Sequence, residues 1–538
     1  MSLQNTIIYG GLKMIRNIST VVFVIFIFVA GSGKGLNDIL GQPIVSNYSY
    51  HPSVFVKDDR LQRIKDAAPA IKQIFEKFAI TNKIPGIAYG IVIDDSLVID
   101  SAMGLINLDK QLPATTNSCF RIASMTKSFT AMAILKLRDE GKLNLHDPVS
   151  DYIAEMDSLK YITSDAPAIN IQHLLTMTTG LPQDDPWGDR LLDETEQMVL
   201  DMFVQGVSFS NIPAFEYEYC SLGYALLGII ISRVSGKPYQ DYISENILKP
   251  LGMEQTYWEY SDIGEAQLVQ GYRWEDEQWK EEPMLHDGSF GAMGGLITTI
   301  KDFGKYVSFH LSAWPPRNGE ETGPVKRSTL REMHTPQFPR LKAESTNSKG
   351  DTCATMSGYG YGLSIIRDCR GITLIRHGGA LPGFGSNYIF YPEYGVGIMA
   401  FGNLTYTFPL PEKEFGTFLF ETVGIQPRQL PVSDILLQRQ EQIVQLIQSW
   451  DSGMETEILA ENFYLDISRK HRMTSIHDIF DAAGTIIKIN TIEPTNQLRG
   501  DIKIQAENGI INVFFTLSPE KDPKIQELVV SFIPNESK

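Results

Sequence analysis

"RIASMTKSFTAMAILKLRDEG", residues 121–141, places a serine three positions before a lysine at the start of an apolar segment. The apolar residues recur at helical spacing and Gly141 is a typical stop, which predicts a buried helix that begins near Ser124. Residues three apart share one helix face, so Ser124 and Lys127 are expected to point into the same space. An amine placed there can take a proton from the hydroxyl. A capping serine followed by a solvated lysine is the alternative, and the rest of the chain has to distinguish the two.

Composition and charge describe an ordinary globular protein. The chain has 538 residues, of which 43% are hydrophobic and 21% are charged, enough for more than one core. Its formal net charge of −17 offers no basic surface for a phosphate backbone, so nucleic acid is not an expected partner.

The N-terminus has the pattern of an export signal. Lys13 and Arg16 precede the apolar run "VVFVIFIFVAGSG", residues 21–33, which ends in small residues. We therefore expect a signal peptide over 1–33, a connector over 34–60, and an exported protein, periplasmic or secreted. Retention of the segment as a membrane tether is the alternative, and Met14 is an alternative start.

Cysteine and histidine spacing predicts no metal site and no cofactor. The four cysteines, Cys119, Cys220, Cys353 and Cys369, form no Cys-x-x-Cys pair, and no His-x-x-x-His pair occurs. Cys353 and Cys369 flank a strand pattern and could form a disulfide, a question that the sequence leaves open.

The order of predicted elements is that of an α+β protein. Residues 63–80 have an amphipathic helical pattern, and helical patterns dominate from 124 to 258. Strand patterns lie on both sides of this helical region, at 86–95, 96–106, 360–368, 371–379, 386–395 and 396–403. A sheet assembled from both ends of the segment, with helices inserted between, is expected to form a domain over 61–427.

A second, small α+β domain is expected over 428–538. A Pro-containing linker at 426–434 precedes a predicted helix over 435–450, for which Gly453 is the expected stop. Strand patterns follow at 486–492, 498–506, 510–517 and 525–532, and Asn508-Gly509 is a hairpin turn signal. This order is similar to the cone-shaped fold of nuclear transport factor proteins.

Two further stretches, "FEYEYCSLGYALLG" (215–228) and "LIRHGGALPGFGSN" (374–387), complete a set of three ordered motifs. Together with Ser124 and Lys127 they resemble the signature elements of the class C β-lactamase superfamily, with its penicillin-binding proteins, D-aminopeptidases, DD-peptidases and esterases. The resemblance covers about residues 61–425. It implies an antiparallel sheet flanked by helices, as in β-lactamases and transpeptidases, with an inserted helical region.

The resemblance implies three catalytic residues. Ser124 matches the family's nucleophile and Lys127 the base beside it. Tyr219 matches the tyrosine that relays a proton to the leaving group, and its offset from "GYALLG" favours it over Tyr217. Lys127 can act as a base only if burial or nearby positive charge lowers its pKa.

The third motif implies a substrate-binding strand edge. His377, Gly378 and Gly379 match the family's Lys-Thr-Gly or His-x-Gly element. The two glycines would let a substrate backbone lie against the strand. The backbone N–H groups of Ser124 and Ala380 would hold the oxyanion.

Two positions depart from the usual pattern. Ser221 stands where the family has an asparagine, so the amide donor is missing. His377 stands where many relatives have a lysine; an unperturbed histidine titrates near pH 6.5, so we expect a partial charge that attracts a substrate carboxylate, and an orienting hydrogen-bond donor near the oxyanion strand is the alternative role. The loop "DDPWGDR", 184–190, is expected to overhang the site, so that Asp185 or Trp187 contacts substrate; a solvated loop is the alternative.

The expected function is that of an exported serine acyl-hydrolase that acts through a Ser124 acyl-enzyme. D-amino-acid peptides or esters are the expected substrates, since both departures weaken the case for efficient β-lactam turnover. A true β-lactamase is one alternative, and a catalytically silent binding protein that keeps the penicillin-recognising fold is another. The expected partner is a small-molecule or short-peptide substrate, and the oligomeric state is left open.

Overall fold

A computed structural model of the chain describes residues 50–346 and 350–535. Its main element is a nine-stranded antiparallel sheet. In spatial order the strands are β3 (Leu112–Pro113), β2 (Ser96–Asn107), β1 (Gly86–Ile93), β14 (Val396–Gly402), β13 (Phe384–Tyr391), β12 (Thr373–Leu381), β11 (Ser364–Arg367), β10 (Thr352–Tyr359) and β9 (Arg340–Thr346). The predicted α+β fold class is confirmed, with strands from both ends of the first domain meeting at β1 and β14. The expected signal peptide, 1–33, lies outside the described residues, as does most of the connector.

The central strands are apolar on both faces because each face carries its own core. Along β1, Ile87, Tyr89 and Ile91 belong to one buried cluster, and Ala88 and Val92 belong to the other. This alternation follows from the two-residue period of a strand. It explains why β1 reads as a continuous hydrophobic run rather than as alternating polar and apolar residues.

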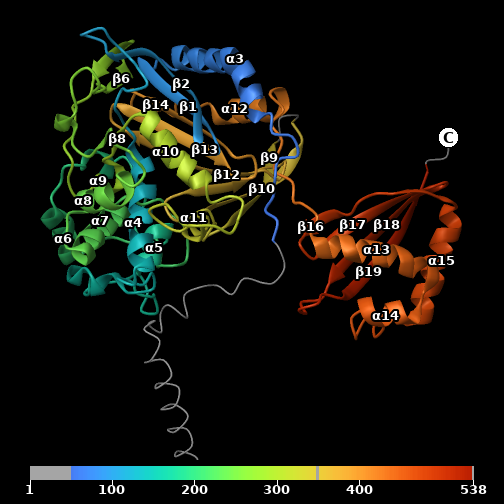
Figure 1. Cartoon of the computed structure of the whole chain (residues 1–538). Coiled ribbons are helices and arrows are strands. Elements are labelled where there is room, and N and C mark those ends of the chain that lie inside the picture. Colours follow the sequence, from blue (N-terminus) through green and yellow to red (C-terminus); the bar gives the residue numbers. More distant parts are fainter. Residues whose placement is uncertain (1–49, 347–349, 536–538) are drawn as a thin grey trace, which may run out of the picture.

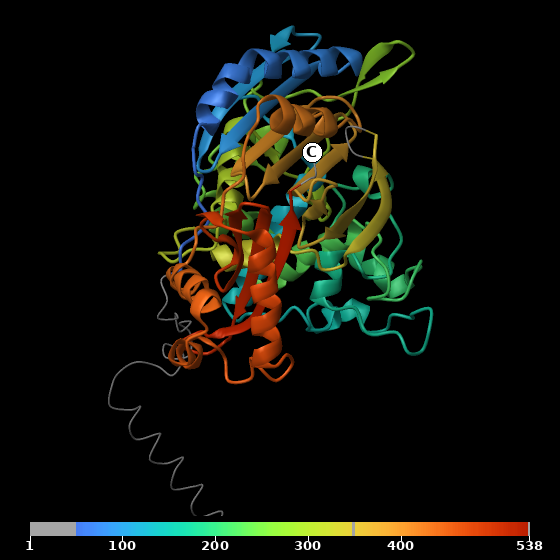
Figure 2. The same cartoon turned by 90° about the vertical axis from the view of Figure 1, so that its right-hand side faces the viewer.

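Helices cover both faces. Helix α3 (Arg60–Thr81) lies against β1 and β2, and its Phe75 ring stacks on Tyr89 with centroids 4.0 Å apart. Helix α10 (Ile300–Leu311) packs on β1, β2 and β14 from the opposite side. Figure 1 shows the sheet between these helices, and Figure 2 shows α3, in blue, running across it.

The remaining helices of this body form the predicted helical region and its flanks. They are α4 (Lys127–Asp139), α5 (Ile171–Thr176), α6 (Glu196–Gln205), α7 (Leu222–Ser235), α8 (Tyr239–Ile243), α9 (Gly291–Gly294), α11 (Arg327–Met333) and α12 (Glu412–Thr417). Two small sheets accompany them: β4 (Phe120–Arg121), β8 (Ile297–Thr298) and β5 (Thr256–Tyr257) form one, and β6 (Tyr272–Glu275) and β7 (Gln278–Glu281) form the other. Helix α7 is buried from Leu222 to Ile231, and this part of its sequence is apolar almost throughout, whereas α4 also buries the polar side chains of Lys127, Ser128 and Thr130.

A second sheet with its own core follows residue 430. Its strands are β15 (Ile486–Ile489), β16 (Glu493–Asn496), β17 (Arg499–Ala506), β18 (Gly509–Leu517) and β19 (Ile525–Pro534). Helices α13 (Asp434–Ser449), α14 (Ser452–Ile458) and α15 (Arg469–Ala483) accompany it (Figure 1, orange and red). Alternate residues of β17 and β18 are buried in a cluster that shares no residue with the two clusters of the first sheet. The boundary expected near residue 428 stays a prediction.

Three local expectations differ from the structure. Helix α13 ends at Ser449, and the next residue, Trp450, adopts a left-handed conformation with φ of 46°. Gly453 lies inside α14 instead of stopping α13. The hairpin between β17 and β18 pairs Ala506 with Gly509, so its loop is one residue earlier than the expected Asn508-Gly509 turn. Strands β9 and β10 were not expected, because their polar sequence lacks an apolar pattern.

Within the described part of the chain, no helix combines the length and apolar character needed to cross a membrane.

Candidate active site

Ser124 lies at the point where the chain turns from β4 into α4. It belongs to a short 3₁₀ helix, η1 (Ala123–Thr126), that continues into α4 at Lys127. Ala123 has a φ of 51°, a left-handed conformation that costs an alanine about 1–2 kcal/mol. The Ser386 hydroxyl donates to the carbonyl of Ile122 at 2.7 Å, and this bond ties the turn to β13. The structure therefore fixes the position of the Ser124 side chain through a strained but well-anchored backbone.

Lys127 lies directly beside Ser124, as the three-residue spacing predicts. Its Nζ donates to the Ser124 hydroxyl at 2.8 Å and to the carbonyl of Met293 at 3.2 Å. The Thr130 hydroxyl donates to the carbonyl of Ala292 at 2.6 Å, which holds α9, and with it the Met293 carbonyl, against α4. Lys127 is fully buried and Ser124 is 7% exposed.

Burial lowers the pKa of Lys127 below its ordinary value. The carboxylates of Asp185, Asp184 and Asp189 act in the opposite direction, but the loss of solvation is the larger effect. A lysine with a lowered pKa has a larger neutral fraction, and only the neutral amine can accept a proton.

Tyr219 completes the group of three residues. It precedes α7, and the centroid of its ring lies 4.9 Å from Nζ of Lys127. Burial, reinforced by the Asp185 carboxylate, raises its pKa well above the ordinary value, so its hydroxyl keeps its proton. Tyr217, the rival in register, also lines the cavity, but its ring packs at a tilt against Tyr359 with centroids 5.6 Å apart. The structure brings Tyr219, not Tyr217, to the lysine.

Strand β12 passes close to the serine because it has glycines where it approaches the turn. A Cβ on Gly379 would lie 2.1 Å from the carbonyl oxygen of Ile122 and 2.6 Å from Oγ of Ser386. A Cβ on Gly378 would instead meet the ring of Phe408 at 2.7 Å. Strand β11 pairs with β12 only as far as Arg376, so the residues of β12 after Arg376 have no partner on that side among the described strands.

Ser124, Gly378 and Ala380 line one cavity of about 360 Å³. Tyr219 and His377 line it as well. Apart from Lys127, seven residues were expected at the site, and five of them line this cavity. Its other lining residues are Gln183, Asp185, Asp189, Tyr217, Tyr359, Ser364, Arg376, Tyr406 and Phe408.

The expected charge on His377 is wrong. The side chain is 4% exposed, and burial together with the positive charge of Lys127 lowers its pKa to about 3. Its Nδ1 lies 2.6 Å from the carbonyl oxygen of Gly378, and its Nε2 lies 2.9 Å from the Tyr359 hydroxyl. These partners fit a neutral ring whose Nδ1–H donates to the carbonyl and whose Nε2 accepts from the tyrosine. His377 therefore cannot serve as a titrating attractor for a substrate carboxylate near neutral pH.

Ser221 and Gly379 do not line the cavity. The Ser221 side chain is fully buried, and its hydroxyl donates to Asp185 at 3.3 Å. Its backbone N–H and that of Leu222 donate to Asp184, at 2.7 and 2.6 Å, so this carboxylate caps the start of α7. In this structure Ser221 supports the loop that carries Asp185 and is placed to support substrate binding only indirectly.

The loop expected to overhang the site divides between two cavities. Asp185 lines the cavity beside Ser124, whereas Trp187 lines a neighbouring hollow of about 490 Å³. Sequence reasoning missed Asp189, Arg376 and Tyr406 as cavity residues. The polar cluster of 184–190 signalled Asp189, but nothing local indicated that Tyr406 would meet it, because 217 residues separate them.

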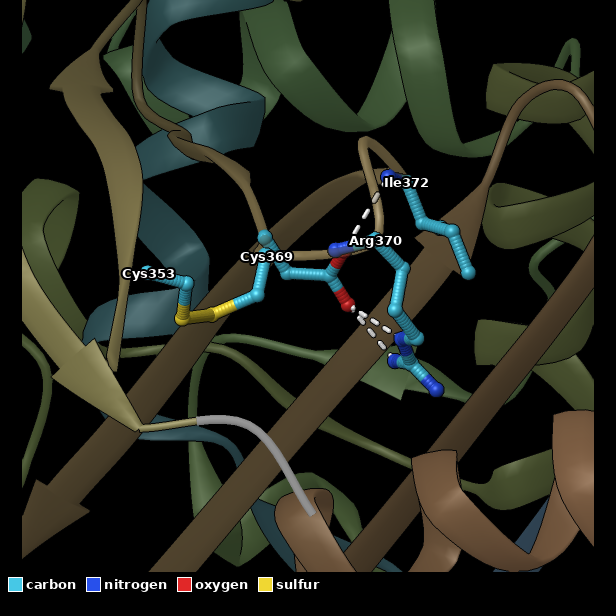
Figure 3. The surroundings of a disulfide bond; sticks show 5 residues. Cys353, Cys369, Arg370 and Ile372 are labelled. Atoms are coloured by element: carbon cyan, nitrogen blue, oxygen red, sulfur yellow. Dashed lines mark hydrogen bonds and ion pairs between the residues drawn. A yellow bond between two sulfur atoms is a disulfide. The ribbon is translucent and has the colours of Figure 1, made fainter. Parts of the chain in front are cut away.

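Cys353 and Cys369 form a disulfide, which answers the question that the sequence left open. Figure 3 shows this bond joining β10 to the turn between β11 and β12. Within the turn, Asp368 accepts from the backbone N–H of Ile372 at 3.0 Å and from the guanidinium of Arg370. The disulfide thus links β10, whose last residue Tyr359 lines the cavity, to the turn that precedes β12, whose Arg376 also lines it.

No group of three or more His, Cys, Asp or Glu residues is placed to hold a metal ion in the described ranges. The expectation that no cofactor takes part stays a prediction.

Comparison with known proteins agrees with this geometry. The sequence model of the Beta-lactamase family matches residues 71–416. "Protein flp" of Staphylococcus aureus strain MW2 is 27% identical over 344 residues, which is 63% of this chain and 64% of that protein. "Beta-lactamase-like protein 2" of Dictyostelium discoideum is 30% identical over 312 residues, 56% of this chain and 54% of that protein. The chain thus spans less than two thirds of the length of these curated relatives.

A solved structure shares the fold over most of the chain. The octameric penicillin-binding protein homologue from Pyrococcus abyssi covers 87% of this chain and 96% of its own, with a TM-score of 0.55 and 21% sequence identity.

Proposed function

The chain belongs to the β-lactamase family, and we propose that it is a serine hydrolase that cleaves an amide or ester bond through an acyl-enzyme on Ser124. One observation carries the proposal: Nζ of the buried Lys127 lies 2.8 Å from the Ser124 hydroxyl oxygen. Because burial lowers the pKa of this amine, it is suited to take the hydroxyl proton.

Acylation follows from the positions of the groups. The neutral amine of Lys127 takes the proton of Ser124 while Oγ forms a bond to the substrate carbonyl carbon. The backbone N–H groups of Ser124 and Ala380 stabilise the negative charge that develops on the carbonyl oxygen. The bond to the leaving group then breaks, and Tyr219 donates the proton that this group needs, which Lys127 replaces. Attack by water on the ester of Ser124 releases the acid and restores the site.

D-amino-acid peptides or esters are the proposed substrates. The neutral state of His377 supports this choice, since the residue supplies no positive charge for the carboxylate of a β-lactam. A true β-lactamase and a silent penicillin-recognising protein are the alternatives. The silent protein is kept because Ser221 replaces the usual asparagine and Gly378 replaces the threonine of Lys-Thr-Gly, so that the hydroxyl of that threonine is missing.

Export is part of the proposal. A disulfide between Cys353 and Cys369 supports it, because such bonds persist mainly in oxidising compartments. We propose a periplasmic or secreted protein, with a membrane tether if the N-terminal segment is retained. Its partner is then a small-molecule or short-peptide substrate.

Mass spectrometry of the intact protein tests the proposal after separate exposure to a fluorophosphonate, a penicillin and an activated ester. We expect a covalent adduct on Ser124 from the fluorophosphonate and a transient one from the ester. Accumulation and turnover of a penicilloyl adduct would favour the β-lactamase alternative. A folded protein that forms no adduct with any of the three would support the silent binding protein.

A further inference from the structure

Asp189 lines the cavity beside Ser124, and one oxygen of its carboxylate has no hydrogen-bond partner. The residue is 2% exposed, and its Oδ2 accepts from the Tyr406 hydroxyl at 3.0 Å. Among the residues that the structure describes, no donor reaches the other oxygen, Oδ1. A buried acceptor without a partner destabilises the free protein, so a ligand that supplies a donor there gains binding free energy.

The surrounding charges favour a cationic donor. Asp185 lines the same cavity, and Asp184 lies behind it at the start of α7. Arg376 lines the cavity too, but its guanidinium is hydrogen-bonded to Glu412 and is thereby compensated. Among the charged side chains that line the cavity, the uncompensated charge is therefore negative.

We propose that Asp189, supported by Asp185, forms a subsite for a positively charged group of the substrate, such as a primary ammonium. This inference rests on the proposed function, since it places the ammonium on the molecule whose carbonyl Ser124 attacks. The subsite adds a preference for cationic substrates, which the proposed reaction itself does not require. A cavity of about 360 Å³ has room for the reacting carbonyl and a short alkylammonium chain together.

The preference is expected to depend on pH. Burial and the neighbouring Asp185 raise the pKa of Asp189 to about 7, while the hydrogen bond from Tyr406 and the charge of Lys127 oppose this rise; Asp184 adds to it. Asp189 is thus ionised mainly above pH 7 and protonated mainly below it. Because an alkylammonium stays charged to about pH 10, the preference for cationic substrates should increase from pH 6 to pH 8.

The test compares esters that carry a primary ammonium on an alkyl chain of varied length with isosteres that carry a methyl group instead. We expect kcat/KM to favour the best ammonium ester by about tenfold or more at pH 8. Asp189→Asn should remove most of this ratio and its pH dependence. Asp193→Asn is the matched control, because Asp193 carries the same charge nearby but is exposed and does not line the cavity.

A binding measurement separates this inference from the proposed function. In Ser124→Ala protein, calorimetry should show tighter binding of the ammonium ester than of its isostere, and Asp189→Asn should abolish the difference. If no ester is hydrolysed but this difference in binding is seen, the proposed function fails and the subsite stands. If both esters are hydrolysed at equal efficiency, or if Asp193→Asn lowers the ratio as much as Asp189→Asn, the subsite is wrong.

Discussion

At the scale of single residues, burial of a basic side chain decides whether it carries a charge at the site. Lys127 and His377 are both basic residues at the cavity, and burial lowers the pKa of each. For the lysine this change creates a base. For the histidine, the lowered pKa removes the positive charge that was expected because many relatives have a lysine at this position.

Ser124→Ala tests the nucleophile. The substitution removes the hydroxyl that accepts from Lys127 but leaves the buried turn intact. We expect ester hydrolysis to fall by a factor of at least about a thousand, because the substitution removes the proposed nucleophile. The free energy of unfolding should change little. Labelling that persists at Cys220, the buried thiol next to Tyr219, would contradict the assignment.

His377→Gln tests the buried neutral histidine through stability. A folded-state pKa of about 3 lies below the ordinary 6.5, so the unfolded chain binds the extra proton first. The stabilising contribution is therefore fully present above pH 6.5 and is lost as the pH falls. Between pH 7 and pH 5 this loss is about 2 kcal/mol for one such residue.

Denaturant unfolding of the parent and of His377→Gln at pH 7 and pH 5 provides the measurement. The parent should lose more stability on acidification than the variant, by about 2 kcal/mol. Equal losses would mean that the histidine titrates normally in the folded protein. In that case His377 would be able to carry a positive charge and attract a substrate carboxylate, as the sequence predicted.

At the scale of elements, the site depends on how closely β12 approaches the turn before α4. Gly379→Ala places a methyl group against the carbonyl oxygen of Ile122, which is backbone and has little freedom to move. We expect a loss of about 1–3 kcal/mol in stability and a larger loss of activity, because the oxyanion N–H groups of Ser124 and Ala380 separate.

Gly378→Ala is the matched control for this prediction. The added methyl group meets the ring of Phe408, a side chain that is 52% exposed and can rotate away. Its effect on stability should be smaller than that of Gly379→Ala, as measured by thermal unfolding of both variants. The opposite order would show that Phe408, not the turn, limits the position of β12.

Elements with a strong local period could be predicted from sequence, and elements defined by distant contacts could not. The spacing of Ser124 and Lys127 and the apolar runs of β1 and β14 are local, and the structure has them where expected. Strands β9 and β10 have polar sequences and form through pairing with neighbouring strands, and β10 is also held by a disulfide, so their local sequence does not predict them. The meeting of Asp189 with Tyr406 arises only in the folded chain.

At the scale of the whole molecule, the net charge of −17 attracts cations from a distance as well as at the site. Such long-range attraction weakens as salt shortens the Debye length to about 8 Å at physiological ionic strength. A preference that arises from the buried Asp189 should persist at that ionic strength. Asp193→Asn changes the net charge by the same amount without touching the cavity, so it measures the long-range effect alone.

The two separate cores lead to the last prediction. Every residue proposed for the reaction lies before residue 381, and the cluster formed by α13 to α15 and β15 to β19 contains none of them. Removal of residues 431–538 should therefore leave a folded body that hydrolyses a small ester within about tenfold of the full chain. Circular dichroism and titration of the active serine with a fluorophosphonate would establish the folded fraction before rates are compared. A truncated protein that is folded and reacts with the fluorophosphonate yet fails to turn over the ester would show that the C-terminal part completes the site.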